Sequence, residues 1–285
     1  MISLDEATKD WARDGIWKIA PAGLNWIKEG DRASIGEGAS IGEGARIGDR
    51  ASIGEGAHIG DRAHIGAWAS IGEGARIGDR ARIGEGASIG EGARIGAWAR
   101  IGEGAHIGDR AHIGAWASIG EGARIGDRAR IGEGASIGEG ARIGAWARIG
   151  EGAHIGDRAH IGAWARIGEE ARIGAWARIG DRASIGEWAH IGEGARIGDR
   201  ASIGDRAHIG EGAEESIDLG WADGHRKCIA QVKGVAYIGA GCRWFTLADA
   251  LKHWGSKPNR ELTMCLMQSA VFIAGYKGWL HGDES

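Results

Sequence analysis

The stretch "ARIGAWARIGEGAHIGDRAHIGAWASIGEG" (residues 93–122) repeats a unit of six residues. Every sixth residue is isoleucine, glycine follows it, and alanine stands three residues after each glycine. One remaining slot holds Ser, Arg or His, and the other two hold mostly Glu-Gly, Asp-Arg or Ala-Trp. A period of six matches neither the 3.6-residue period of a helix nor the two-residue period of a strand. It fits a chain that forms a short strand, turns a corner and repeats.

The repeat runs without a gap from Ile35 to Ile209, as thirty hexapeptides of the form Ile-Gly-x-x-Ala-x. On a strand, Ile and the Ala two residues before it share one pleat face, so both are expected to point inward. Alanine suits a position near a corner, where only a small side chain fits. Gly and the two variable residues are expected to form the turn, because glycine tolerates positive φ and close backbone approach.

Ile-Gly-x-x-Ala-x resembles the hexapeptide repeat of the bacterial transferase superfamily, and the resemblance covers residues 33–213. It implies an all-β fold, a left-handed parallel β-helix with three flat faces and eighteen residues in each coil. Thirty hexapeptides then give about ten coils, which at ~4.8 Å for each stacked strand would extend over roughly 48 Å.

The chain is expected to have three parts: an N-terminal helical cap (1–32), the β-helix (33–213) and a C-terminal module (214–285). An open solenoid end exposes strand edges, so caps are needed at both ends. Ser3 and Glu6 have the spacing of a capping box, which predicts a short amphipathic helix over residues 3–17.

The C-terminal module is predicted to contain a hairpin and two helices. Its β-type runs flank the turn signal in "QVKGVA" (231–236), and Thr246 and Asp249 have the spacing of a capping box. A second helix in "NRELTMCLMQSAVFIAGYKG" is apolar on most sides, so it is expected to be buried on two sides. The segment "YIGAGCRWFTLADALKHWG" also resembles C-terminal segments of bacteriophage and prophage proteins.

The amino-acid composition limits which cellular compartments and which classes of partner are expected. The net charge of −4 gives no general basic footprint for nucleic acid, so a nucleic-acid partner is not expected. Three cysteines (Cys228, Cys242 and Cys265) without short spacing suggest reduced thiols. The charged N-terminus lacks a signal-peptide pattern, and no apolar run approaches ~18 residues. We therefore expect a cytoplasmic protein without a membrane span, in the host cytoplasm if it is phage-encoded.

A longer repeat overlies the hexapeptides, because residues 58–105 and 106–153 are identical. The shift of 48 residues is not a multiple of eighteen. Duplicated residues should therefore lie on different faces, and a site copied by the duplication is expected to be rotated away from its partners.

Stacking the sequence in rows of eighteen gives two candidate binding surfaces. One is a basic stripe on the second face, and the other consists of apolar ridges at the corners, formed by vertically paired tryptophans. The candidate residues are Arg130, Arg148 and Arg166 in the stripe, and Trp98, Trp116, Trp146 and Trp164 in the ridges. The alternatives are a solvated, charge-balanced face and indoles that cover their own turns. Residues 33–220 hold 22 basic and 28 acidic residues, so any basic surface must be local.

Histidines raise the alternative of a metal site, because the resemblance extends to gamma-class carbonic anhydrases, which bind zinc through histidines. His190 and His208 are eighteen residues apart and should stack on one face. No third ligand has the family's close spacing, so these two remain weak candidates and neither a metal nor another cofactor is expected.

The favoured function is a non-enzymatic structural or binding solenoid, of the kind a phage could encode, that forms a homotrimer and binds a protein partner. The partner would be bound by the C-terminal module or by the Trp and Arg ladders. The alternative is a hexapeptide-repeat acyltransferase using acyl-CoA. Such enzymes use a histidine base and a loop that embraces the donor. No insertion interrupts residues 33–213, so no catalytic residue can be assigned from the family.

Overall fold

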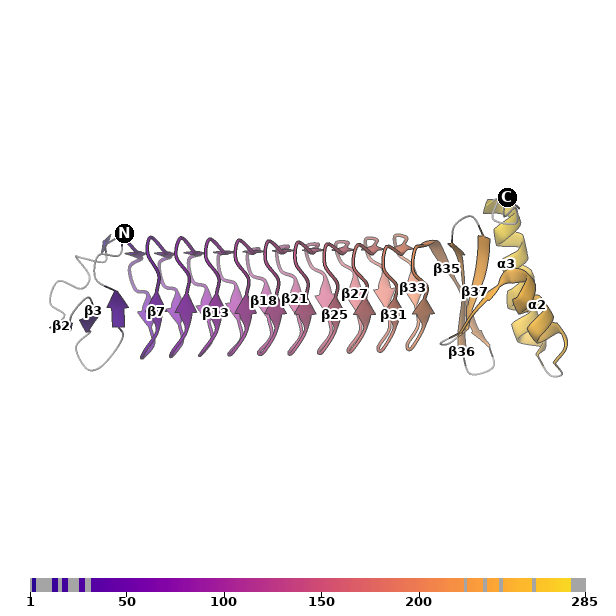
Figure 1. Ribbon diagram of the computed structural model, residues 1–285, viewed down its shortest axis with the longest axis horizontal. Coiled ribbons are helices and arrows are strands. Elements are labelled where there is room, and N and C mark those ends of the chain that lie inside the picture. Colours follow the sequence, from indigo (N-terminus) through magenta and orange to yellow (C-terminus); the bar gives the residue numbers. More distant parts are fainter. Residues whose placement is uncertain are drawn as a thin grey trace. The chain divides into compact units, whose positions relative to one another are not determined.

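The computed structural model describes residues 2–3, 12–14, 17–19, 26–28, 32–222, 225–232, 235–240, 243–257 and 260–277. The chain divides into two compact units, Met1–Gly152 and Ala153–Ser285, and each is described by itself. The hexapeptides of both units form a parallel β-solenoid, about ten turns in all (Figure 1).

Each hexapeptide contributes a strand of two residues, the variable residue and the isoleucine after it. In the first unit these strands are β5 (Ser34–Ile35), β6 (Ser40–Ile41), β7 (Arg46–Ile47), β8 (Ser52–Ile53), β9 (His58–Ile59), β10 (His64–Ile65), β11 (Ser70–Ile71), β12 (Arg76–Ile77), β13 (Arg82–Ile83), β14 (Ser88–Ile89), β15 (Arg94–Ile95), β16 (Arg100–Ile101), β17 (His106–Ile107), β18 (His112–Ile113), β19 (Ser118–Ile119), β20 (Arg124–Ile125), β21 (Arg130–Ile131), β22 (Ser136–Ile137), β23 (Arg142–Ile143) and β24 (Arg148–Ile149). In the second unit they are β25 (His154–Ile155), β26 (His160–Ile161), β27 (Arg166–Ile167), β28 (Arg172–Ile173), β29 (Arg178–Ile179), β30 (Ser184–Ile185), β31 (His190–Ile191), β32 (Arg196–Ile197), β33 (Ser202–Ile203) and β34 (His208–Ile209).

The register confirms a coil of eighteen residues. Ile95 pairs with Ile113, and the strands of a pair run parallel. Backbone hydrogen bonds join successive coils: the amide of Gly96 donates to the carbonyl of Ile113 at 2.8 Å, and the amide of Arg94 donates to Ala111 at 2.9 Å. Because pairing partners are always eighteen residues apart, each coil places three strands on three separate sheets.

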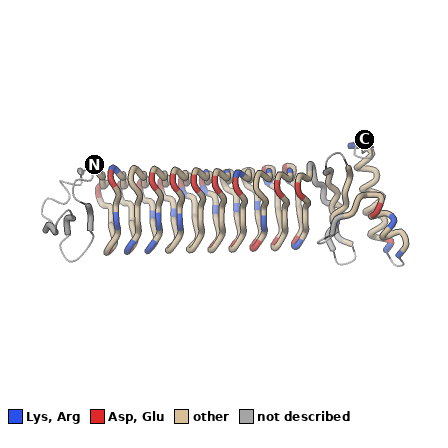
Figure 2. Tube along the Cα trace, in the orientation of Figure 1, with Lys and Arg blue, Asp and Glu red and all other residues tan. Residues whose placement is uncertain are grey.

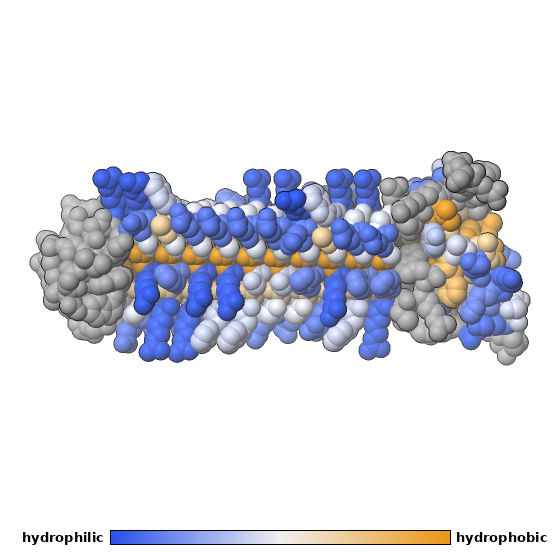
Figure 3. Space-filling model, in the orientation of Figure 1, coloured by the Kyte–Doolittle hydropathy of each residue, from blue (hydrophilic) through white to orange (hydrophobic). Residues whose placement is uncertain are grey.

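The core of both units consists of the repeated isoleucine and alanine. Every isoleucine of the repeat from Ile47 to Ile209 is at most 4 % exposed. Burying such a side chain stabilises the fold by about 1.5–3 kcal/mol, so the repeated column is the main source of solenoid stability. In each unit, Figure 3 shows a row of hydrophobic residues between rows of hydrophilic ones.

The glycine after each isoleucine is required by close approach between coils. A Cβ on Gly102 would lie 2.6 Å from the backbone nitrogen of Glu121 in the next coil. Positive φ occurs at a different slot, the second variable residue, such as Gly104 at +60° or Trp98 at +61°. The two predicted roles of glycine therefore belong to two different positions of the hexapeptide: close approach to the glycine after isoleucine, and positive φ to the second variable residue.

All thirty turns have positive φ at that second variable slot, yet only thirteen of these residues are glycine and seventeen are not. The left-handed conformation destabilises a residue with a Cβ by about 1 kcal/mol or more. At some of these turns a cation–π contact between neighbouring coils offsets part of the strain, as where Arg50 lies over Trp68 and Arg80 over Trp98.

Aspartate at the first variable slot joins coils through its side chain. Oδ1 of Asp109 accepts a hydrogen bond from the amide of Glu91 at 3.0 Å, and the amide of Asp109 donates to Oδ1 of Asp127 at 3.1 Å. These ladders satisfy turn amides that would otherwise face water. Figure 2 shows how acidic and basic residues recur along the repeats of each unit.

At the N-terminus, part of the expected helix is wrong. Residues 4–11 lie outside the described part of the chain, but β2 (Ala12–Asp14), β3 (Trp17–Ile19) and β4 (Trp26–Lys28) form an antiparallel sheet. Asp14 pairs with Trp17 across two intervening residues. β1 (Ile2–Ser3) pairs antiparallel with β5.

The C-terminal part of the second unit is a four-stranded antiparallel sheet with two helices. The strands are β35 (Ala213–Ala222), β36 (His225–Val232), β37 (Val235–Ala240) and β38 (Arg243–Thr246), and the helices are α2 (Leu247–Gly255) and α3 (Glu261–Lys277). β35 lies against β32 and β33 of the solenoid. The predicted hairpin corresponds to β36 and β37, which pair with Val232 opposite Val235. The flanking strands β35 and β38 were not predicted.

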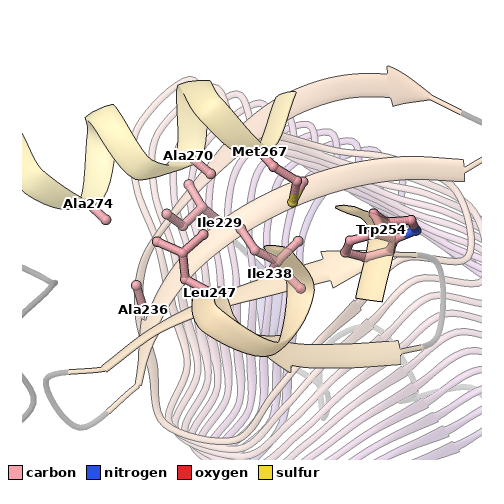
Figure 4. Close-up of a cluster of buried hydrophobic side chains, with 9 residues drawn as sticks. Ile229, Ala236, Ile238, Leu247, Trp254, Met267, Ala270 and Ala274 are labelled. Carbon is pink, nitrogen blue, oxygen red and sulfur yellow. The ribbon is translucent and has the colours of Figure 1, made fainter. Parts of the chain in front are cut away.

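The helices pack on this sheet around one apolar core (Figure 4). Its centre holds Ile229 and Ile238 from the sheet, Trp254 from α2 and Met267 from α3. The predicted capping box at the start of α2 is present: the side chain of Thr246 accepts a hydrogen bond from the amide of Asp249 at 3.1 Å. Figure 4 also shows Met267, Ala270 and Ala274 along the inner side of α3.

Candidate functional site

A basic ladder crosses the second face of the first unit. Six successive strands place side chains in register there, and all six are exposed. The ladder residues are His58, Arg76, Arg94, His112, Arg130 and Arg148. Neighbouring rungs are separated by about 4.8 Å, the spacing of hydrogen-bonded strands. The sequence-predicted residues Arg130 and Arg148 are thus adjacent rungs.

Within the ladder, His112 lies between Arg94 and Arg130. Loss of hydration lowers the pKa of His112, and the two guanidinium groups lower it further. The neutral imidazole therefore predominates at neutral pH, with a nitrogen able to accept a proton. Within the described part of the chain, no carboxylate forms an ion pair with either arginine. We call this arrangement the Arg94–His112–Arg130 triad.

The same triad occurs on the third face, where His64 lies between Arg46 and Arg82. The pKa of His64 is also lowered, first by loss of hydration and then by the two arginines. Each residue precedes its counterpart in the other triad by 48 positions. The expectation that duplication separates a site from its partners is wrong for such residues. Residues that are eighteen positions apart lie on the same face, and a shift of 48 residues moves all of them to the same new face, so they remain neighbours.

A tryptophan follows each triad histidine by four residues, in the turn that ends the histidine's strand. These residues are Trp116 after His112 and Trp68 after His64. Their indoles are 59 % and 56 % exposed. Each triad thus combines cationic groups, a neutral imidazole and an aromatic surface on one coil and its two neighbours.

The candidate ridge of Trp98 and Trp116 exists. Their ring centroids lie 4.9 Å apart, with planes 5° from parallel. Arg80 lies over the ring of Trp98, 4.6 Å from its centroid, and Arg50 lies over Trp68 at 4.4 Å. Cation–π contacts of this kind favour the alternative in which the indoles cover their own turns.

The remaining candidates are distributed between the two units. Trp146 belongs to the first unit, where Arg128 lies 4.7 Å from its ring centroid. Trp164 and Arg166 belong to the second unit, and Arg166 pairs with Ser184.

His190 and His208 are neighbours on one face as predicted, and their rings meet edge to face, with centroids 4.7 Å apart and planes at 68°. Loss of hydration, followed by the charge of His190, lowers the pKa of His208. Among the residues that the structure describes, no group of three or more His, Cys, Asp or Glu side chains is placed to hold a metal ion.

The C-terminal module contains a buried lysine and two cysteines whose surroundings the sequence patterns do not predict. Lys227 is only 1 % exposed, and its Nζ donates a hydrogen bond to the carbonyl of Ala222 at 2.8 Å. The ammonium also lies 5.6 Å from the ring centroid of Trp254. Among the cysteines, Cys228 is buried and Cys265 is exposed, while Cys242 lies outside the described residues.

Comparison with known families supports the identity of the repeat. The profile described as bacterial transferase hexapeptide (six repeats) matches residues 104–137, 117–151, 134–169, 147–181 and 165–199. The profile of the GMPPB C-terminal domain matches residues 30–116. The comparison with curated proteins found no match.

Among solved structures, the chain is similar to UDP-N-acetylglucosamine acyltransferases. The enzyme from Campylobacter jejuni is 22 % identical, with a TM-score of 0.39, over 68 % of this chain and 72 % of that one. The enzyme from Bacteroides fragilis is 25 % identical, with a TM-score of 0.47, over 62 % and 68 %. The H141A mutant of GDP-perosamine N-acetyl transferase from Caulobacter crescentus is 26 % identical, with a TM-score of 0.32, over 34 % and 49 %.

The fold and the repeat together define the class: the protein is a hexapeptide-repeat β-solenoid with repeats of the bacterial transferase type. None of these comparisons supports the resemblance of the C-terminal module to phage proteins. The described helices include none that is long and apolar enough to span a membrane.

Proposed function

We propose that this protein is a hexapeptide-repeat acyltransferase that takes its acyl group from acyl-CoA. The observation that carries the proposal is the Arg94–His112–Arg130 triad, which falls largely within the region that matches the transferase hexapeptide. The lowered pKa of His112 keeps its imidazole neutral and able to act as a general base.

In this reaction His112 removes the proton from a hydroxyl or amine of the acceptor. The acceptor atom attacks the thioester carbonyl, and collapse of the tetrahedral intermediate breaks the carbon–sulfur bond. The departing CoA thiolate takes the proton from the imidazolium, which returns the histidine to its neutral state. The acyl group moves from sulfur to the acceptor oxygen or nitrogen, and no oxidant or metal ion is needed.

The residues around His112 match the chemistry of the donor. Arg94 and Arg130 offer guanidinium groups without carboxylate partners in the described chain, and such groups bind phosphate in a bidentate manner. Trp116 offers an exposed indole at the end of the same strand, on which an adenine ring can stack. The triad at His64 supplies a second set of the same groups.

A homotrimer with parallel solenoid axes is part of the proposal, because adjacent rungs of the first face carry the small side chains of Ser52, Ser70 and Ser88, which allow close association of copies. A second subunit would also enclose the otherwise open face of a triad. We further propose a cytoplasmic location, where acyl-CoA is present.

A second candidate function is a non-catalytic binding solenoid. The observation that favours it is the length of the basic ladder, which extends over six rungs while the proposed catalytic group needs three. Such a ladder suits a partner with a row of anionic groups.

Release of CoA thiol from acetyl-CoA, with hydroxylamine as acceptor, tests the proposed function. Substituting His64 and His112 together by Ala should lower the rate by at least about 100-fold, the usual contribution of a general base. The matched control is His106→Ala, because His106 lies between Ser88 and Arg124 on the first face. Equal rates in the double variant and the control would refute acyl transfer by the triads, and binding without turnover would support the second candidate.

A further inference from the structure

Helix α3 has one covered side and one uncovered apolar side. Thr263, Met267 and Ala270 are fully buried against the C-terminal module. On the opposite side, Phe272 is 75 % exposed and Tyr276 is 82 % exposed. The apolar sequence of α3 predicts burial on two sides, and a single chain buries only one of them.

The uncovered side has the spacing of a coiled-coil seam. We call it the α3 stripe, and its exposed residues are Leu262, Cys265, Ser269, Phe272 and Tyr276. Successive members are three, four, three and four residues apart, the a/d spacing with which one helix packs against another. The partly buried Leu266 and Ile273 border the stripe, so its apolar surface is continuous along the helix.

The stripe is nearly symmetric about Ser269. Leu262 and Tyr276 each lie seven residues from Ser269, in opposite directions, while Cys265 and Phe272 lie four and three residues away. The charged ends of α3 follow the same symmetry, because Glu261 and Lys277 each lie eight residues from Ser269.

This symmetry indicates both the partner and its direction. Antiparallel pairing of two copies about Ser269 would place Glu261 of each copy near Lys277 of the other, and the small Cys265 opposite the bulky Phe272. Parallel pairing would place like charges together at both ends and Phe272 against Phe272. Antiparallel helices also align their dipoles favourably.

We propose that the α3 stripe binds the α3 stripe of a second copy of this chain, antiparallel and about a two-fold axis at Ser269. The contact joins C-terminal modules, so it goes beyond acyl transfer and does not depend on it. The contact pairs chains two by two, so together with the proposed homotrimer it would join two trimers into a hexamer.

Light scattering of the full chain tests the contact. Phe272→Glu should halve the mass, because it places a carboxylate in the centre of an apolar seam. Gln268→Glu is the matched control, since it adds the same charge at an exposed position at the border of the stripe. Circular dichroism at matched concentration distinguishes dissociation from unfolding. A folded Phe272→Glu variant with unchanged mass would overturn the proposal.

Cross-linking tests the direction. In the antiparallel pair the two Cys265 residues are offset by eight residues, about 12 Å along the helix, whereas a disulfide requires Cα atoms within about 7 Å. Mild oxidation should therefore link Ser269→Cys chains in a Cys265→Ser background, while the unaltered chain should not link through Cys265. A disulfide between two Cys265 residues would indicate parallel pairing and overturn the proposal, as would the absence of a Ser269→Cys link.

Discussion

Trp98 and Trp116 lie eighteen residues apart in the sequence and stack with ring centroids 4.9 Å apart. Arg80 covers the other side of Trp98, so the stack continues through three coils. Both indoles still expose a substantial fraction, 41 % and 59 %. Both rings therefore have packing partners within their own chain.

Replacing Trp98 and Trp116 together by Ala should destabilise the fold by about 1–2.5 kcal/mol. The loss combines an aromatic pair worth about 0.5–1.5 kcal/mol with a cation–π contact of about 0.5–1 kcal/mol. Chemical denaturation measures the change, and light scattering should show an unaltered oligomer. A variant with unchanged stability and a smaller mass would instead place these indoles in a subunit interface.

Substituting Gly102 by Ala should destabilise the solenoid severely, by more than about 3 kcal/mol or to the point of misfolding, because overpacking alone typically destabilises by about 1–3 kcal/mol and here the added Cβ meets backbone. The Cβ would lie 2.6 Å from the backbone nitrogen of Glu121, which cannot move without breaking coil-to-coil pairing.

Gly104→Ala, two residues away in the same turn, is the control for this substitution. A Cβ at Gly104 meets no atom within 4 Å, and only the positive φ of +60° opposes it, by about 1–2 kcal/mol. Thermal denaturation of both variants compares the two effects. Equal losses would show that coil spacing adjusts to a methyl group.

Asp109 should contribute about 1 kcal/mol through the hydrogen bond that its Oδ1 accepts from the amide of Glu91. Asp109→Ala removes the acceptor, whereas Asp109→Asn retains an oxygen that can take its place. Urea denaturation should therefore rank the variants as Asp, Asn and Ala in decreasing stability. Glu103→Ala removes an exposed side chain from the same turn slot and serves as the control. If Asn and Ala destabilise equally, the carboxylate charge and not the hydrogen bond is responsible.

Stability should decrease as the pH falls from 7.5 to 5.5. The pKa values of His64 and His112 are lower in the folded chain than the ordinary value of about 6.5. The unfolded chain then binds protons more readily than the folded chain. The contribution of the two neutral histidines to folding stability is therefore complete above the ordinary pKa and is lost as the pH falls below it. Substituting both residues by Gln should flatten the fall, while His106→Gln should not.

Inorganic phosphate should offset part of this loss at pH 5.5, because it binds best when the triad histidine is protonated between its arginines. The readout is the denaturation midpoint at constant ionic strength, with chloride in place of phosphate as the comparison. A loss of stability that phosphate leaves unchanged would contradict anion binding by the triads. Phosphate binding should strengthen as the pH falls, whereas the rate of acyl transfer should decrease, since the general base must be neutral.

Several features were predictable because they depend on residues close together in the chain. The hexapeptide period predicted a short strand in each repeat and the inward Ile and Ala, and the capping box at Thr246 marked the start of α2. Stacking in rows of eighteen, which the family resemblance supplied, also paired Trp98 with Trp116. These predictions rest on local geometry, which the same short sequence imposes at every repeat.

Other features needed the tertiary structure. The sequence alone assigned glycine two roles, and only the distance between coils separates the close approach at Gly102 from the positive φ at Gly104. Rows of eighteen already place His112 between Arg94 and Arg130, but the lowering of its pKa, first by loss of hydration and then by the two arginines, follows only from the structure.

The sequence by itself determined a repeating β-solenoid, because its period and its small residues allow one local conformation at each slot. The tertiary structure decided which side of α3 is covered. Thr263 and Phe272 belong to one apolar helix, and helix periodicity cannot distinguish a side that meets the sheet from one that meets water. That distinction arises from packing between segments far apart in the chain, where Ile229 and Ile238 of the sheet contact the inner side of the helix core.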